Sequence, residues 1–128
     1  IETFMKQPFV MTGSDGSGGH PRKYGTYARK IRRYVLDKPV ITMERMVQAS
    51  SAQVAETFGL PRRGRLEDGY FADVIVFDPK TIRDAATYPE PERLAEGMRW
   101  VFVNGVAAVR EGQLTGALPG RALSKVAP

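Results

Sequence analysis

The spacing of hydrophobic and polar positions along the chain changes near residue 60. Up to about residue 60, apolar side chains recur every three or four positions, which is typical of amphipathic helices. Beyond it, they form short β-prone runs separated by Gly, Pro and Asn. The chain therefore divides into residues 1–60, with a strand, a loop and helices, and residues 61–128, with a small antiparallel β unit and a C-terminal tail.

Two helical segments stand out within residues 22–50. The first ends at Pro39 and carries an apolar stripe opposite a basic face that we expect to be solvated. The apolar stripe consists of Tyr24, Tyr27, Ala28, Ile31 and Val35. The basic face consists of Arg29, Lys30, Arg32 and Arg33. The second begins at Thr42, which is suited to N-cap a helix whose inward residues are Met43, Met46 and Val47.

A third, short helix is expected to run through Val54 and Phe58 to Gly59. Ser50 and Gln53 have the spacing of a capping box at its start, and Gly59 suits a left-handed C-terminal cap. Residues 22–59 are thus predicted to be mainly helical.

The β-rich half contains one particularly strong signal, the Asn104-Gly105 pair between two apolar runs. Because a type I′ turn needs positive φ at both central positions, this pair predicts a two-residue hairpin. The other expected features are a short strand at 64–66, a turn at 68–69, a strand within 71–78, an irregular polar connection at 80–97, a second turn at 111–112 and a surface tail from residue 116.

A Gly/Ser-rich loop at Gly13–Pro21 follows a short apolar run, Phe9–Thr12, that we interpret as a buried strand. The loop carries Asp15 and the only histidine of the chain, His20. A loop at a strand end is a common place for catalytic groups, so Asp15 is a candidate catalytic acid. The alternative is that Asp15 is an ordinary turn residue whose side chain bonds nearby backbone amides.

Composition narrows the possible classes of function. The 128 residues are 42% hydrophobic, which is typical of a globular domain, and no run approaches the ~20 apolar residues of a membrane span. The absence of cysteine excludes disulfides, thiolate metal ligands and a cysteine nucleophile, and agrees with a cytoplasmic location. The chain begins at Ile1 without an initiator methionine, so we expect it to be part of a longer polypeptide.

The charge distribution bears on nucleic-acid binding. The net charge is +5, and six of the 19 basic residues lie between Arg22 and Arg33. A charge run opposite an apolar stripe is usually a helix surface, and no aromatic residues alternate with these charges to stack on bases. We therefore expect no nucleic-acid or membrane partner, and keep a basic interaction module as the minor alternative.

Several motifs together resemble one family. They occur in this order: Gly-Ser-Asp-Gly, His-Pro-Arg, Gly-Thr-Tyr, Phe-Gly-Leu, Arg-Gly-Arg-Leu, Gly-Tyr-Phe-Ala-Asp-Val-Ile-Val-Phe-Asp-Pro, Val-Asn-Gly and Thr-Gly-Ala-Leu-Pro-Gly-Arg. The set, from about residue 9 to residue 123, resembles the C-terminal part of the N-acyl-D-amino-acid deacylases, or D-aminoacylases, of the metal-dependent amidohydrolase superfamily.

The resemblance implies a fold and a reaction. The fold would be an α/β plus β arrangement: the last strand and helices of a (β/α)8 amidohydrolase barrel in 1–60, followed by part of a small antiparallel β-sandwich domain in 61–128. The reaction would be hydrolysis of the amide bond of an N-acyl-D-amino acid to a carboxylate and a D-amino acid. Another amidohydrolase branch, of the dihydroorotase or hydantoinase type, remains the alternative.

The resemblance also implies roles for three residues. Asp15 would take a proton from metal-activated water and pass it to the departing amine. His20 and Arg22 would bind the substrate carboxylate, although a purely structural role in the loop is an equally good interpretation. Zinc would be the cofactor, with its principal ligands outside this chain, because a single histidine is too few for a self-contained site.

The same resemblance implies that this chain is incomplete as an enzyme. Its natural partner would be the N-terminal part of the same protein, which would bring the metal ligands and the remaining strands. The isolated chain is therefore expected to be inactive and to self-associate through apolar edges that those strands would cover.

Overall fold

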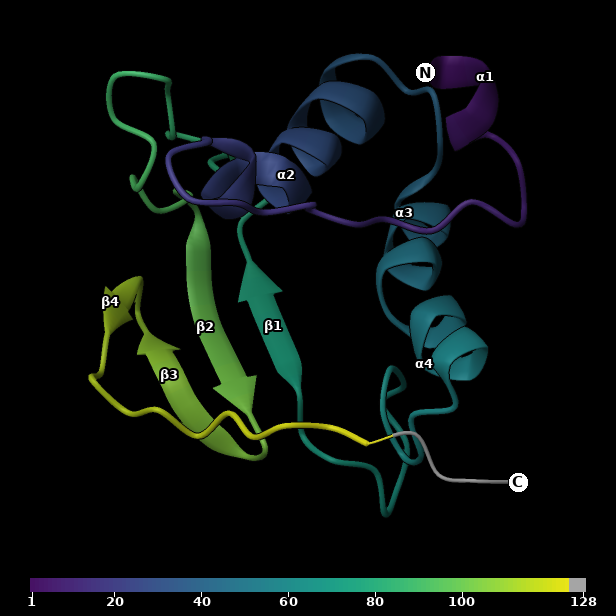
Figure 1. Ribbon diagram of the computed structural model, residues 1–128, viewed down its shortest axis with the longest axis vertical. Helices are drawn as coiled ribbons and strands as arrows, with labels where there is room; N and C mark the ends of the chain where they lie inside the picture. Colours follow the sequence, from purple (N-terminus) through teal and green to yellow (C-terminus); the bar gives the residue numbers. More distant parts are fainter. Residues whose placement is uncertain (125–128) are drawn as a thin grey trace.

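Helices occupy the first half of the chain and a sheet occupies the second (Figure 1). The computed structural model describes residues 1–124. The helices are α1 (Glu2–Met5), α2 (Arg22–Ile31), the π-helix η1 (Arg32–Asp37), α3 (Met43–Ser50) and α4 (Ala52–Phe58). The strands are β1 (Val74–Phe77), β2 (Met98–Val103), β3 (Val106–Arg110) and β4 (Gln113–Leu114). The predicted change from helix to strand near residue 60 is confirmed.

The four strands form one antiparallel sheet in the order β1-β2-β3-β4. Asn104 and Gly105 join β2 to β3 with φ values of 50° and 82°, so the predicted hairpin turn is confirmed. Glu111 and Gly112 form the second predicted turn, between β3 and β4, with φ values of 48° and 82°. Because each turn needs only two adjacent residues, this part of the fold was visible in the sequence.

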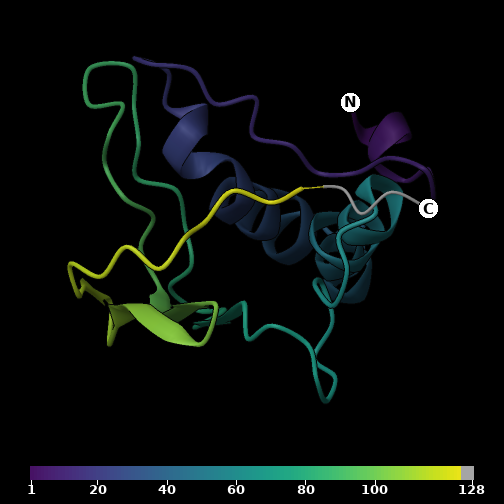
Figure 2. The ribbon, with the colours of Figure 1, turned by 60° about the horizontal axis from the view of Figure 1, so that its bottom comes forward.

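The hydrophobic core lies among the helices rather than on the sheet. Its members come from α2, the α2–α3 connection, α3 and the segment after β1: Ala28, Ile31, Ile41, Met46 and Ile82. Helix α2 lies across one end of β1 and β2, and Figure 2 shows the sheet as a separate layer beside the helices. No strand residue is fully buried, and Ile75 and Leu114 are 53% and 67% exposed.

The ends of the predicted helices are largely confirmed. Thr42 caps α3, its Oγ1 accepting a hydrogen bond from Arg45 N at 3.2 Å. Gly59 ends α4 in the left-handed conformation, with a φ of 62°. The first helical segment stops at Asp37, just before Pro39, but its last six residues form the π-helix η1.

Three details of the predicted helices are wrong. The capping box at residues 50–53 does not form: Ser50 Oγ donates to Met46 O at 2.8 Å, and Gln53 Nε2 donates to Pro8 O at 2.8 Å. Each side chain therefore has a partner outside the box. Val47 and Tyr27 were expected to be inward but are 51% and 41% exposed, because the elements around α2 and α3 cover only a narrow stripe of each.

Two predicted strands do not form in the described chain. Phe9–Thr12 forms no strand, and Phe9 is 70% exposed; the Thr12 amide instead donates to Ala49 O at 2.9 Å. A strand requires a neighbouring strand for its backbone hydrogen bonds, and the described part of the chain places none beside this segment. The predicted strand at 64–66 is also absent. Gly64 has a φ of 81°, which is outside the range of strand backbone, and it lies against the backbone of Ser51 between α3 and α4.

The connection at 80–97 is irregular, as predicted, but it is not merely a polar surface segment. Ile82 is 0% exposed and belongs to the helical core. Arg83 and Glu96 pair across the base of the connection, with backbone hydrogen bonds of 3.2 and 3.0 Å and an ion pair of 2.6 Å. The connection is thus a closed loop anchored in the core.

The N-terminal helix was not predicted from the sequence, whereas the C-terminal tail was. The short helix α1 lies in residues 1–8, where the sequence shows no periodicity. The tail after Gly116 passes the Asn104 turn, where Asn104 Nδ2 donates to Pro119 O at 2.8 Å (Figure 1). Residues 125–128 of the predicted tail lie outside the described residues. Within residues 1–124, no helix has the length and apolar character that a membrane span needs.

Candidate functional site

The loop that carries Asp15 leaves the helical layer at Thr12, a buried polar residue. The Thr12 hydroxyl accepts a hydrogen bond from Lys30 Nζ at 2.7 Å and contacts Ser50 Oγ at 3.0 Å. The Thr12 amide donates to Ala49 O at 2.9 Å. One end of the loop is therefore fixed to both α2 and α3.

The Asp15 backbone is in the left-handed region, with a φ of 46°. Aspartate is one of the few residues other than glycine that adopts this conformation readily. Its side chain is 84% exposed and pairs with Arg22 in the first turn of α2, with 2.9 Å between Asp15 Oδ2 and Arg22 Nη1. The loop thus presents a carboxylate at the surface beside a guanidinium.

His20 is linked to Arg22 through the backbone. The Arg22 amide donates to His20 Nδ1 at 3.1 Å. The three residues singled out from the sequence, Asp15, His20 and Arg22, are therefore brought together by one ion pair and one hydrogen bond. This cluster of a carboxylate, an imidazole and a guanidinium can move a proton and bind an anion.

Tyr88 also contacts this cluster, a contact that no local pattern in the sequence indicates. Tyr88 Oη lies 3.3 Å from His20 Nε2, and the two rings meet edge to face with their centroids 5.2 Å apart. Tyr88 belongs to the 80–97 connection, which lies next to the Asp15 loop in both views (Figures 1 and 2). No motif or periodicity marks this contact, because it joins residues 68 positions apart.

Lys30 of α2 is bonded to Thr12 at the start of the loop, in a partly buried position near Arg45. Burial lowers the pKa of its ammonium group, and the nearby positive charge of Arg45 lowers the pKa further. The predicted solvated basic face is therefore wrong at this residue, since its Nζ reaches inward to the Thr12 hydroxyl.

Arg45 on α3 holds the segment that leads into the loop. Its Nη2 donates to the carbonyls of Gln7, Pro8 and Val10 at 3.1, 3.0 and 2.8 Å. Its Nη1 donates to Gln53 Oε1 at 2.8 Å. Since the segment has no strand partner among the described residues, this guanidinium takes the place of sheet hydrogen bonds.

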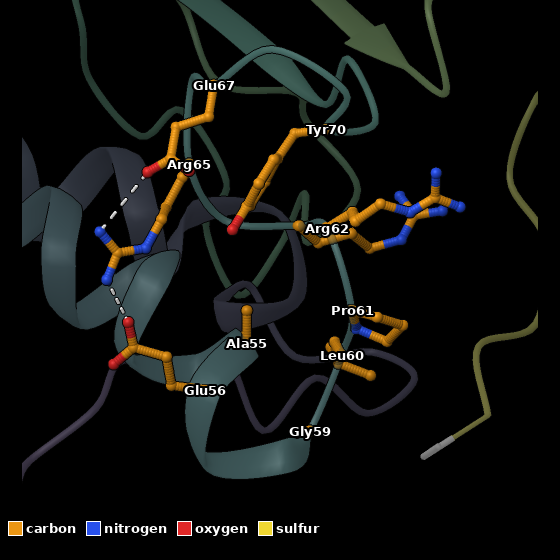
Figure 3. A pocket seen from close by; sticks show the side chains of 10 residues that line it. Ala55, Glu56, Gly59, Leu60, Pro61, Arg62, Arg65, Glu67 and Tyr70 are labelled. Atoms are coloured by element: carbon orange, nitrogen blue, oxygen red, sulfur yellow. Dashed lines mark hydrogen bonds and ion pairs between the residues drawn. The ribbon is translucent and has the colours of Figure 1, made fainter.

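A surface hollow lies elsewhere on the described chain. It has a volume of about 590 Å³ and lies between the end of α4 and the turn that precedes β1 (Figure 3). Arg65 pairs there with Glu56 and Glu67, so opposite charges in the hollow already compensate one another. None of Asp15, His20 and Arg22 lines it, and the hollow provides no support for the predicted chemistry.

The basic residues of α2 and η1 are mostly used inside the molecule. Arg29 pairs with Asp84 at 2.8 Å, and Arg22 pairs with Asp15. Arg32 donates to the carbonyls of Pro79, Lys80 and Ile82 at 3.0, 2.9 and 2.8 Å. With Lys30 bonded to Thr12, four of the six basic residues between Arg22 and Arg33 have hydrogen-bond or ion-pair partners within the described chain.

The described part of the chain holds no group of side chains suited to a metal ion. Among residues 1–124, no three His, Asp or Glu side chains gather closely enough to hold a metal ion, and the chain has no cysteine. The described residues therefore do not constitute a zinc site.

Comparison with known proteins shows the family. Residues 1–109 match the model of the amidohydrolase family. Two curated relatives come from Alcaligenes xylosoxydans xylosoxydans: a D-aminoacylase, 40% identical over 92% of this chain, and an N-acyl-D-glutamate deacylase, 40% identical over 98% of it. The chain spans only about a quarter of each relative, 25% and 26% respectively.

Solved structures show the same relationship. A D-aminoacylase structure from work on its binuclear metal center superposes with a TM-score of 0.88 at 36% identity, covering 95% of this chain and 27% of that one. N-acyl-D-glutamate deacylase from Bordetella bronchiseptica, complexed with zinc and a phosphonate inhibitor, superposes with a TM-score of 0.80 at 37% identity, covering 91% and 27%. By sequence and by structure, this chain belongs to the amidohydrolase family.

Proposed function

We propose that this chain forms the C-terminal part of a deacylase that hydrolyses N-acyl-D-amino acids to a carboxylate and a D-amino acid. The observation that carries the proposal is the cluster of Asp15 and His20 on one loop with Arg22 at the start of α2. The chain's similarity to a D-aminoacylase and to an N-acyl-D-glutamate deacylase supports this substrate class.

The proposal includes a place for each half of the chain in the complete enzyme. Residues 1–60 would contribute the last strand and the helices of a (β/α)8 barrel, and residues 61–128 part of a small β-sandwich. In that arrangement, Phe9–Thr12 would pair with barrel strands supplied by the N-terminal part of the same protein. Asp15 would then follow the C-terminal end of a barrel strand, where barrel enzymes place their catalytic residues.

In the proposed reaction, Asp15 is the proton carrier. Its carboxylate accepts a proton from the attacking water and later delivers it to the nitrogen of the departing D-amino acid. The side chain is 84% exposed on its loop, so a substrate can approach the carboxylate even though its Oδ2 pairs with Arg22. Arg22 and His20 would bind the substrate carboxylate by charge-assisted hydrogen bonds.

We propose zinc as the cofactor of the complete enzyme, with ligands from residues outside this chain. Zinc is supported by a similar protein, an N-acyl-D-glutamate deacylase whose structure is complexed with zinc. The ligands are placed outside this chain because the described residues hold no group of three His, Asp or Glu suited to a metal. The cytoplasm is the proposed compartment, on the basis of the cysteine-free composition.

The decisive experiment is Asp15→Asn in the full-length enzyme with zinc bound. Loss of a positioned acid–base group should lower kcat for an N-acyl-D-amino acid by about 10²- to 10⁴-fold. Asp68→Asn is the matched control, because Asp68 is also an exposed aspartate before a glycine and should leave kcat unchanged. Normal turnover by Asp15→Asn would remove Asp15 from the mechanism.

The alternative branch is decided by a substrate panel on the unmodified full-length enzyme. Release of D-amino acids from N-acyl-D-amino acids supports the proposed function. Hydrolysis of cyclic amides alone would instead assign the enzyme to the dihydroorotase or hydantoinase branch.

Self-association is proposed for the isolated chain. β1 and β4 each pair with one neighbour among the described residues, and exposed apolar residues such as Ile75 and Leu114 lie on these edge strands. Sedimentation of the isolated chain should therefore show association that increases with concentration. A monomer at every concentration would contradict this expectation.

A further inference from the structure

Tyr88 has an unused hydrogen-bond donor beside the Asp15 loop. That its hydroxyl hydrogen is unused follows from the direction of the two hydrogen bonds that His20 makes. A backbone amide can only donate, so His20 Nδ1 must accept from the Arg22 amide at 3.1 Å. The proton of the neutral imidazole is then on Nε2, which donates to Tyr88 Oη at 3.3 Å.

It follows that Tyr88 acts as an acceptor toward His20 and keeps its own hydroxyl hydrogen available. In the part of the chain that the structure describes, His20 is the one polar partner of this hydroxyl. Tyr88 is 74% exposed, so a ligand can approach it from solvent. The edge-to-face contact with His20 limits how the ring moves.

The surroundings favour an anionic acceptor for this hydrogen. Arg22 and Lys23, in the first turn of α2, bring two positive charges to this end of the loop, and Asp15 brings one negative charge. A ligand carboxylate would therefore meet two cationic side chains at this end of the loop, where Arg22 is already paired with Asp15, while Glu90 and Arg93 of the 80–97 connection pair with each other. Tyr88 adds a neutral, directional donor there.

We propose that Tyr88 binds the carboxylate of the substrate, donating its hydroxyl hydrogen to a carboxylate oxygen. This inference rests on the proposed function, because it takes an N-acyl-D-amino acid as the ligand. It assigns a substrate-binding role to the β half of the chain, and makes the 80–97 connection one wall of the site.

The test is binding of two probes to the full-length enzyme, by isothermal titration calorimetry in an Asp15→Asn background that leaves the ligand intact. The probes are N-acetyl-D-leucine, which has a carboxylate, and N-acetyl-D-leucinamide, which is neutral. Tyr88→Phe keeps the aromatic ring and removes the hydroxyl. It should raise Kd roughly tenfold for the acid and less than twofold for the amide, as expected for one lost bond to a charged group.

Tyr34→Phe is the matched control, because Tyr34 lies on η1 at the opposite end of the helical segment from Arg22. It should change neither Kd. An equal loss for both probes in Tyr88→Phe would mean that Tyr88 only shapes the loop and would overturn the inference. No change for either probe would also overturn it.

The proposed function is judged separately, by release of D-leucine from N-acetyl-D-leucine by the enzyme with Asp15 intact. Absence of turnover together with a carboxylate-selective effect of Tyr88→Phe would reject the deacylase and retain Tyr88 as an anion-binding residue. Normal turnover without that selectivity would retain the deacylase and reject the role of Tyr88.

Discussion

Arg32 Nε donates a hydrogen bond to the backbone carbonyl of Ile82 at 2.8 Å, and thereby joins the helical segment to the chain that leaves β1. The Ile82 side chain is at the same time fully buried in the core among Ala28, Ile31 and Met46. The two halves of the chain are therefore connected by both a polar and an apolar contact at one residue.

Removal of the Ile82 side chain should destabilise the whole chain. Ile82→Ala is expected to lower the free energy of unfolding by about 2–5 kcal/mol, because it leaves a cavity in the core. Urea denaturation followed by circular dichroism measures this change. Ile75→Ala removes the same atoms from a side chain that is 53% exposed, and should cost less than about 1 kcal/mol. Equal costs for the two variants would contradict the placement of Ile82.

Gly97 and Gly105 provide a comparison of backbone strain with and without a steric clash. Their φ values are 81° and 82°, but a Cβ at Gly97 would lie 2.5 Å from Ile82 N, whereas nothing lies within 4 Å of a Cβ at Gly105. Gly105→Ala should therefore cost only the left-handed strain, about 1–2 kcal/mol. Gly97→Ala should cost clearly more, which thermal unfolding of the two variants can measure. A smaller cost at Gly97 would rule out the close approach to Ile82.

Lys30 should make the free energy of unfolding depend on pH in the alkaline range. Its pKa is lowered in the folded chain from the ordinary value of 10.5, first by burial and then by the charge of Arg45. Between the folded pKa and the unfolded pKa, the unfolded chain binds more protons, so stability should rise with pH in this alkaline window. Below the folded pKa, the cost of burying the charge is fully present.

Lys30→Met removes the titrating group and should flatten this rise, which urea titrations at several alkaline pH values would show. Arg33→Met removes an exposed cation from the same helical segment and is the control, expected to keep the slope. A slope that is unchanged in Lys30→Met would contradict the role of Lys30.

Arg45 should determine how tightly the approach to the Asp15 loop is held. Arg45→Lys cannot reproduce the donor fork that bonds Gln7, Pro8 and Val10, so some of these carbonyls lose their partner. We expect a loss of about 1–3 kcal/mol and faster hydrogen exchange at the Thr12 amide. Hydrogen exchange measured by mass spectrometry would locate the effect in residues 7–12. Exchange confined to other segments would show that Arg45 does not hold this one.

The sequence predicted the features that depend on adjacent residues. Asn104-Gly105 and Glu111-Gly112 define their turns by conformational preference alone, and Thr42 and Gly59 mark helix ends for local reasons. The strand signal at Phe9–Thr12 failed because a strand requires a partner that this segment does not have among the described residues. The capping box at Ser50 and Gln53 failed because each side chain found a different partner.

The candidate site was predicted only in part, for the same reason. Asp15, His20 and Arg22 are close in sequence, so their association could be expected from one motif-bearing loop. Tyr88 and Arg32 act across 68 and 50 positions respectively, and no local pattern encodes such contacts. Contacts of this kind become visible only once the chain is folded.

The closed base of the 80–97 connection has a consequence for how this protein can vary. Ile82 fixes one side of the base in the core, Gly97 packs against it, and Arg83 and Glu96 pair across it. Insertions and deletions between residues 87 and 95, beyond the Arg29–Asp84 pair and the buried Ala86, should leave this base intact while they shift the segment that carries Tyr88. A change of loop length there should therefore move Tyr88 without disturbing the core.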